Sequence, residues 1–106
     1  MTTAAFKRLR ADVFKRADES CECGCGRFIT PETGHLDHFF GRARHESLQT
    51  CWALSVECDR ARTDNHPDAA TWADRFYLHA IKHGYHEAAE MAVARIRVLV
   101  AKKLAS

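Results

Sequence analysis

The stretch "GHLDHFFGR" (residues 34–42) places a carboxylate and an imidazole side by side at the end of a short apolar run. Twenty residues after His38, the stretch "CDRART" (residues 58–63) sets a second carboxylate, Asp59, directly after a cysteine. The first stretch is typical of a strand and the second of a helix start. Whether they are two halves of one metal-centred site is the question on which a functional prediction depends.

Two strands and a helix are predicted around these stretches. "HLDHFF" (35–40) predicts one strand, and "LQTCWAL" (48–54) predicts a second because it is rich in aromatic and β-branched residues. "GRARHES" joins them as an exposed loop, so the two strands form a hairpin. A helix begins near Val56 and runs to Asn65, where Asn-His-Pro interrupts it.

Helices are predicted on both sides of this hairpin. Residues 4–18 carry an apolar stripe at helical spacing, and residues 19–34 are a loop rich in cysteine, glycine and turn residues. After Pro67, "DAATWADRFYLHAIKHG" and "HEAAEMAVARIRVLVAKKLA" predict a pair of helices. The last helix is apolar over most of its circumference, which favours two packing neighbours or a homodimer contact.

Length and composition narrow the class of protein. A chain of 106 residues predicts a single domain over 1–106, and the order of elements predicts the α+β class. No apolar run is long enough to cross a bilayer, and no secretory signal begins the chain, so we expect a cytoplasmic protein without a membrane partner. Five cysteines in a reducing compartment favour metal binding over disulfides. A net charge of +2 does not by itself indicate a nucleic-acid partner.

The chemistry of the two stretches suits phosphodiester hydrolysis. Histidine takes up and releases a proton near neutral pH, and Mg²⁺ is often held by one or two carboxylates. Asp37 and His38 are neighbours on a strand, so one side chain can bind metal while the other reaches towards substrate. Asp59 can supply a further ligand if its helix packs across the hairpin. A polar pair at the end of a strand is the alternative for Asp37 and His38 taken alone.

Taken together, "LDHFFGRARHESLQTCWALSVECDRART" resembles the motif of the HNH endonucleases, the ββα-metal finger. The resemblance covers about residues 21–66 and implies a treble-clef-like core, flanked by the helix at 4–18 and the helical hairpin at 67–105. Carried over by position, it makes Asp37 a metal ligand and His38 the general base. Ser47 stands where the family has a loop-ordering asparagine, and Asp59 where it has a last histidine ligand. "RT" at 62–63 matches the Lys-Thr that ends the motif.

The departures from the motif change the expected chemistry. Asp59 in place of histidine makes the site harder and favours Mg²⁺ or Mn²⁺ over softer metals. Ser47 shortens the hydrogen-bonding arm that holds the loop, so activity could be reduced or absent.

The resemblance also implies a structural zinc ion held by two pairs of cysteines. The second pair is altered here, because Ser55 stands where its first cysteine belongs. We therefore expect an all-thiolate Zn²⁺ site compensated by a third cysteine upstream, with Cys51 or His35 as substitute ligands if one of the three is free. A zinc-free protein with Cys51 and Cys58 simply buried is the alternative. The predicted ligands are Cys21, Cys23, Cys25 and Cys58.

Three functions fit these patterns. The first is a metal-dependent DNA endonuclease, and the second is an inactive module of the same fold that binds nucleic acid or a protein partner. The third is a structural zinc-knuckle domain that dimerises through its last helix. Each of four arginines, taken alone, is best explained as a solvated surface charge. Taken together, the four favour DNA-backbone contacts without sequence readout. These arginines are Arg42, Arg44, Arg60 and Arg62.

Overall fold

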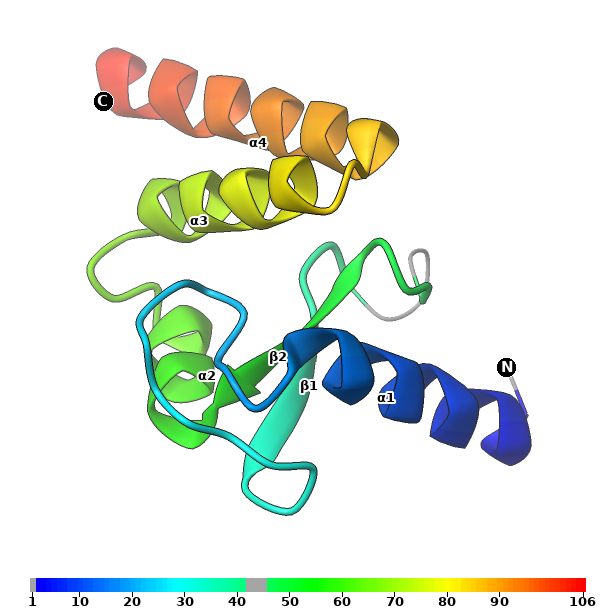
Figure 1. The fold of residues 1–106 in the computed structure, drawn as a ribbon. Helices are drawn as coiled ribbons and strands as arrows, with labels where there is room; N and C mark the ends of the chain where they lie inside the picture. Colours follow the sequence, from blue (N-terminus) through cyan, green and yellow to red (C-terminus); the bar gives the residue numbers. More distant parts are fainter. Residues whose placement is uncertain (1, 42–45) are drawn as a thin grey trace. The chain divides into compact units, whose positions relative to one another are not determined.

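A two-stranded antiparallel sheet followed directly by a helix carries half of the predicted site residues (Figure 1). Strand β1 (Gly34–His38) pairs with β2 (Cys51–Ser55), with Gly34 opposite Ser55 and His38 opposite Cys51. Helix α2 (Val56–Thr63) begins at the residue after β2. This computed structural model describes residues 2–41 and 46–106. The predicted α+β class, with a hairpin and helix flanked by an N-terminal helix and a C-terminal helical pair, is confirmed.

The chain divides into two units by its internal contacts. The first covers residues 1–59 and the second covers residues 60–106. Each unit is described by itself, and the expected single domain over 1–106 stays a prediction. The same is true of its expected internal boundaries, although the predicted helices and hairpin are all present.

Helix α1 (Thr3–Ala17) packs against β2 in the first unit. The Thr2 hydroxyl accepts a hydrogen bond of 3.1 Å from the Ala5 N–H, which satisfies one of the free donors at the helix start. Asp18 ends the helix in a left-handed conformation. The apolar stripe predicted from the sequence is the buried face, and its buried residues are Leu9, Val13, Phe14 and Ala17.

The strands are shorter than predicted because tight turns bound them. The Thr50 N–H donates to the Ser47 carbonyl at 3.2 Å, so residues 48–50 form a turn and β2 begins only at Cys51. β1 ends at His38, although the Phe39 N–H still donates to the Thr50 carbonyl at 3.2 Å. All five residues of β2 are buried, so both faces of this strand are covered.

Gly34 begins β1 where the chain passes very close to α1. A Cβ atom at this position would lie 2.6 Å from Cε1 of the Phe14 ring. Glycine is therefore required by packing between the strand and the helix.

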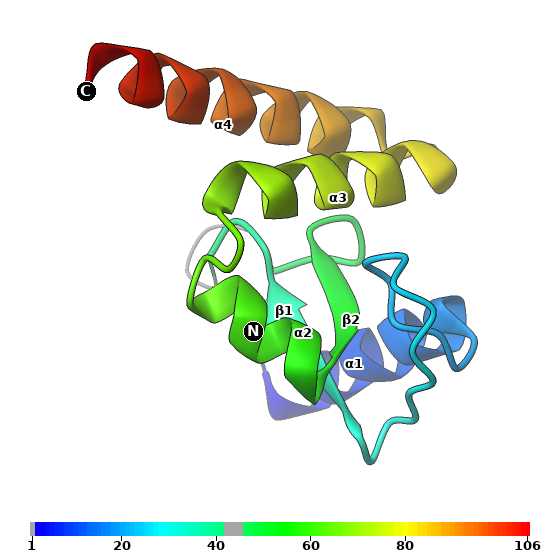
Figure 2. The same cartoon turned by 90° about the vertical axis from the view of Figure 1, so that its left-hand side faces the viewer.

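The second unit contains a pair of helices, α3 (Ala69–Lys82) and α4 (His86–Ala105), which lie side by side (Figure 2). Asp68 caps α3 by accepting a hydrogen bond of 2.7 Å from the Thr71 N–H, and this bond lowers the pKa of Asp68. Gly84, with φ of +72°, forms the turn between the helices. Among the described residues, no helix is long and apolar enough to cross a membrane. The buried residues of the pair include Trp72, Phe76, Ala80, Ala88 and Ala92.

Candidate functional site

Four cysteine sulfurs gather at one point in the first unit. Three of these cysteines lie in the loop between α1 and β1, and the fourth lies in α2. Their Sγ atoms all lie within 4.8 Å of one another, and none is in a disulfide. The cluster is Cys21, Cys23, Cys25 and Cys58, the set predicted from the sequence.

The separations within this cysteine cluster fit a tetrahedral metal. The Sγ atoms of Cys21 and Cys23 are 3.4 Å apart, and Sγ of Cys58 lies 3.6 Å from those of Cys23 and Cys25. Four sulfurs at about 2.3 Å from a zinc ion are about 3.8 Å from one another. These three separations are within about 0.4 Å of the tetrahedral value, and all four sulfurs lie within 4.8 Å of one another.

Backbone turns and hydrogen bonds give the cysteine loop its shape. Gly24 and Gly26 both have positive φ, of 88° and 85°, which lets the chain reverse between the cysteines. The Glu22 N–H donates to the Ala53 carbonyl at 2.8 Å, so the loop is attached to β2. The cysteine spacing alone, which is tighter than the usual Cys-x-x-Cys, does not reveal this attachment.

Ser55 supports the cluster in a different way from the cysteine that the family resemblance would place there. Its backbone N–H donates to Sγ of Cys21 at 3.3 Å, and its hydroxyl accepts from the Cys58 N–H at 3.1 Å. The hydroxyl acts as an N-cap for α2, which fixes the helix turn that presents Cys58. Ser55 therefore orients the sulfurs of Cys21 and Cys58.

The thiols of the cluster shift one another's pKa values. Its hydrogen bond with the Cys23 thiol lowers the pKa of Cys21 to about 4, despite burial, with help from the Ser55 N–H. The same contact, together with burial, raises the pKa of Cys23, and burial raises that of Cys58. The guanidinium of Arg27 donates to Sγ of Cys58 at 3.5 Å, and the sulfurs raise the pKa of Arg27. A cation suits a group of this charge.

The fifth cysteine is not part of the cluster. Cys51 begins β2 with no exposed surface, and burial raises its pKa to about 11. His35 lies on β1, and its Nδ1 contacts Asp59. Neither of these alternative zinc ligands belongs to the group of sulfurs that the described residues form.

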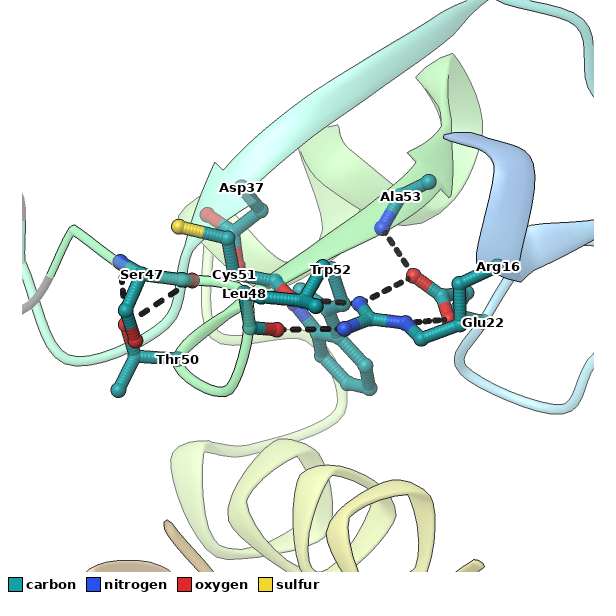
Figure 3. A network of polar contacts seen from close by, with 9 residues as sticks. All are labelled: Arg16, Glu22, Asp37, Ser47, Leu48, Thr50, Cys51, Trp52 and Ala53. Carbon is teal, nitrogen blue, oxygen red and sulfur yellow. Dashed lines mark hydrogen bonds and ion pairs between the residues drawn. The ribbon is translucent and has the colours of Figure 1, made fainter. Parts of the chain in front are cut away.

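Asp37 faces the partner strand. Its Oδ2 accepts a hydrogen bond of 2.8 Å from the indole N–H of Trp52, which is the residue opposite it in the sheet (Figure 3). Trp52 is fully buried, so the bond fixes the orientation of the carboxylate. Second-sphere hydrogen bonds of this kind commonly orient metal ligands.

His38 is held by a carboxylate that the sequence analysis missed. Its Nε2 lies 3.0 Å from Oε1 of Glu46, and its ring is stacked with Phe6 at a centroid distance of 6.4 Å. Both side chains of the His38–Glu46 pair are mostly buried, with exposed fractions of 12% and 19%. Ser47 itself bonds to Thr50 and so forms the turn that follows Glu46. The only sequence signal for Glu46 is its position next to Ser47, where the family motif places the loop-ordering residue.

Asp59 lies close to β1, where its carboxylate contacts the imidazole of His35. The Asp59 Oδ2 and His35 Nδ1 atoms are 2.9 Å apart, and the His35 side chain is half exposed. Among the described residues, neither Asp37 nor Asp59 belongs to a group of three or more potential metal ligands. The expected ion between these two aspartates therefore stays a prediction.

The candidate phosphate contacts are only partly described. Arg42 and Arg44 lie outside the described residues. Arg60 is exposed on α2, and Arg62 is half-buried near Arg95, whose pKa is lowered by burial and by the charge of Arg62. Their role with nucleic acid stays a prediction.

Neither a protein-family model, nor a curated protein sequence, nor a solved structure matches this chain. The likeness to the HNH endonucleases therefore rests on the quoted residues. The structure shows an α+β protein with a four-cysteine cluster suited to a metal ion.

Proposed function

We propose that this chain is a metal-dependent DNA endonuclease of HNH type, built on a ββα unit that a structural zinc ion holds together. The observation that best supports the proposal is the His38–Glu46 pair, which lies beside Asp37 at the end of β1. An imidazole held by a carboxylate is a recurring arrangement for a general base.

Zinc is the metal that best suits the cysteine cluster. Four thiolates favour Zn²⁺, and a site with four protein ligands has no open position for substrate, so its role is structural. The cluster joins the loop after α1 to α2, two segments more than thirty residues apart in the chain. Free thiols of this kind also favour the reducing cytoplasm that the composition predicts.

His38 is proposed to activate the attacking water. If Nε2 carries the proton that lies between His38 and Glu46, Nδ1 is the free nitrogen that takes a proton from water. Glu46 then stabilises the imidazolium that forms, and the Phe6 ring limits rotation of the imidazole. Glu46 thus does for the base what the family asparagine is expected to do.

A divalent ion is proposed to be bound by Asp37 and Asp59. Carboxylate oxygens suit Mg²⁺ or Mn²⁺, and such an ion, when bound, would neutralise negative charge on the phosphate. The indole N–H of Trp52 donates to Oδ2 of Asp37, which orients the carboxylate of this proposed ligand. Asp59 would have to exchange its contact with His35 for the ion. Arg42, Arg44, Arg60 and Arg62 are the proposed contacts with the DNA backbone.

The proposal is tested by incubating supercoiled plasmid with the zinc-loaded protein and Mg²⁺ or Mn²⁺. We expect nicking by the wild-type protein and a loss of about 100-fold or more in rate for His38→Ala, because general-base catalysis contributes on that order. His66→Ala is the matched control, since this exposed histidine lies outside the ββα unit, and it should nick at the wild-type rate. Absence of nicking with every divalent metal would reject the enzyme, and equal nicking by His38→Ala would indicate a contaminating nuclease.

The second candidate, an inactive module of the same fold, is favoured by the contact between Asp59 and His35. If that pair is kept in solution, Asp59 does not bind a metal ion, and the zinc-bound ββα unit would serve to grip nucleic acid or a protein. A fluorescently labelled DNA duplex separates the candidates. Salt-sensitive binding without hydrolysis supports the module, whereas binding with hydrolysis supports the enzyme.

A further inference from the structure

An open groove runs between α3 and α4 in the second unit. Its volume is about 450 Å³. Tyr77 and Ile81 of α3 form one wall, and Val93 with Ala94 of α4 forms part of the other. Glu90 and Arg97 lie along the same α4 wall with His86 and Ala89, so the groove combines apolar side chains with two opposite charges.

The apolar surface continues beyond the groove towards the end of α4. Leu104 is 83% exposed, and Val100 is 45% exposed, on the same side of the helix as Val93. Ile81, at the other end of the groove, is 47% exposed. Aliphatic surface extending over the length of a helix is typical of a protein contact.

The two charges make this surface complementary to itself. Glu90 and Arg97 are seven residues apart, so they point about 20° from one another around the helix. If a second α4 lies antiparallel across the first, with the two-fold axis between Val93 and Ala94, Glu90 of each copy faces Arg97 of the other. Both ion pairs form at once, and the small side chain of Ala94 lets the helices approach at the axis.

The same arrangement would cover Leu104, the exposed leucine near the end of α4. Leu104 lies about 16 Å along the helix from the axis. On the second copy, the point at the same distance from the axis, opposite Leu104, is the turn between α3 and α4, next to Ile81. The most exposed large apolar side chain would therefore cover the apolar end of the other copy's groove.

We propose that this chain forms a two-fold symmetric dimer in which the α4 helices of two copies cross antiparallel, joined by reciprocal Glu90–Arg97 ion pairs. The occupant of the groove is the α4 helix of a second copy. This inference does not depend on the proposed nuclease activity, because every residue that it uses lies in the second unit.

Sedimentation equilibrium of the full chain at low ionic strength tests the dimer. Wild type should be dimeric, and Glu90→Arg or Arg97→Glu should each raise the dissociation constant about tenfold or more, since each places two like-charge pairs across the interface. The double variant Glu90→Arg/Arg97→Glu restores both pairs with reversed sign and should return to within about threefold of wild type. Lys102→Glu is the control, because Lys102 points about 140° away from Arg97 and should leave the constant unchanged.

Three results would overturn the proposal. They are a monomeric wild type throughout the concentration range, a double variant as weak as the single variants, and an equal effect of Lys102→Glu. Far-UV circular dichroism of each variant verifies that the helices are intact, so a lost dimer cannot be mistaken for lost folding.

Discussion

Cys58 shows what single residues contribute to the candidate metal centre. From the sequence, Cys58 could be predicted to bind the metal ion with the three upstream cysteines, because Ser55 stands in place of one cysteine of the expected second pair. It could not decide between Cys51, His35 and the third upstream cysteine, since that choice depends on where β2 lies in the fold. The structure gathers Cys21, Cys23, Cys25 and Cys58 and buries Cys51 in the first unit.

Replacing Cys58 with serine should weaken zinc binding strongly. The variant keeps the size of the side chain but loses the only thiolate that α2 supplies, so the remaining ligands all come from one loop. Loss of an outer-sphere partner commonly costs 10- to 100-fold in metal affinity, so we expect loss of a ligand to cost at least about 100-fold. Competition with a chromophoric chelator measures the dissociation constant.

Cys51→Ser is the matched control for that experiment. Its hydroxyl would be buried in the first unit, so the free energy of unfolding should fall while zinc affinity stays close to wild type. Equal zinc affinity in wild type and Cys58→Ser would contradict the assignment of Cys58 as a ligand.

Glu46 marks the limit of residue-level prediction at the candidate catalytic site. It lies eight residues from His38, across a loop whose path no spacing rule gives. Asp59 contacts His35, whereas the sequence predicted that it would bind a metal ion together with Asp37. His35 and Asp37 lie two residues apart on one face of β1, so both are close to Asp59 in the chain's predicted arrangement. Sequence reasoning could place Asp59 near the strand, but it could not choose between two neighbours on that strand.

At the scale of elements, helices were predicted better than strands. Apolar periodicity and turn residues are local signals, and they predicted α1, α3 and α4 to within a residue or two. The strands depend on contacts from distant segments. The Ser47–Thr50 turn shortens β2, and contacts from the cysteine loop and α1 contribute to covering it. β2 is buried throughout, on both of its faces.

Arg16 joins three elements of the first unit (Figure 3). Its guanidinium donates to both carboxylate oxygens of Glu22 at 2.8 Å, and to the carbonyl oxygens of Leu48 and Cys51. Glu22 also accepts a 3.0 Å hydrogen bond from the Ala53 N–H. The side chains of the Arg16–Glu22 pair are only 10% and 4% exposed, so a buried ion pair joins α1 to the cysteine loop.

Arg16→Met should lower the free energy of unfolding by about 3–5 kcal/mol, because it removes the guanidinium that pairs with the buried Glu22 carboxylate. Urea denaturation of the zinc-loaded protein measures the change. Arg8→Met is the matched control on the exposed side of α1 and should change stability by less than about 0.5 kcal/mol.

A double variant separates charge from packing in this network. Arg16→Met/Glu22→Gln removes both charges, so it should be more stable than Arg16→Met alone. A double variant as unstable as the sum of the two single variants would show that the pair is not coupled.

At the scale of the whole molecule, the proposed zinc ion is the feature on which the folding of the first unit depends most. The first unit has 59 residues, a size at which a bound metal often supplies a substantial part of the folding free energy. The cluster links the loop after α1 to α2. In the chain, this loop precedes β1, which carries Asp37 and His38, and α2 follows β2. The order of the elements could be predicted from the sequence, but the division into two units could not, because it reflects contacts that no local pattern encodes.

Native mass spectrometry of the chain folded with Zn²⁺ tests this account most directly. We predict one zinc ion per chain, together with protection of Cys21, Cys23, Cys25 and Cys58 from alkylation until a chelator removes the metal. After removal, the near-UV circular dichroism of Trp52 and its neighbours should collapse. A metal-free chain that unfolds cooperatively, with those four thiols reactive and the same near-UV spectrum, would contradict the account.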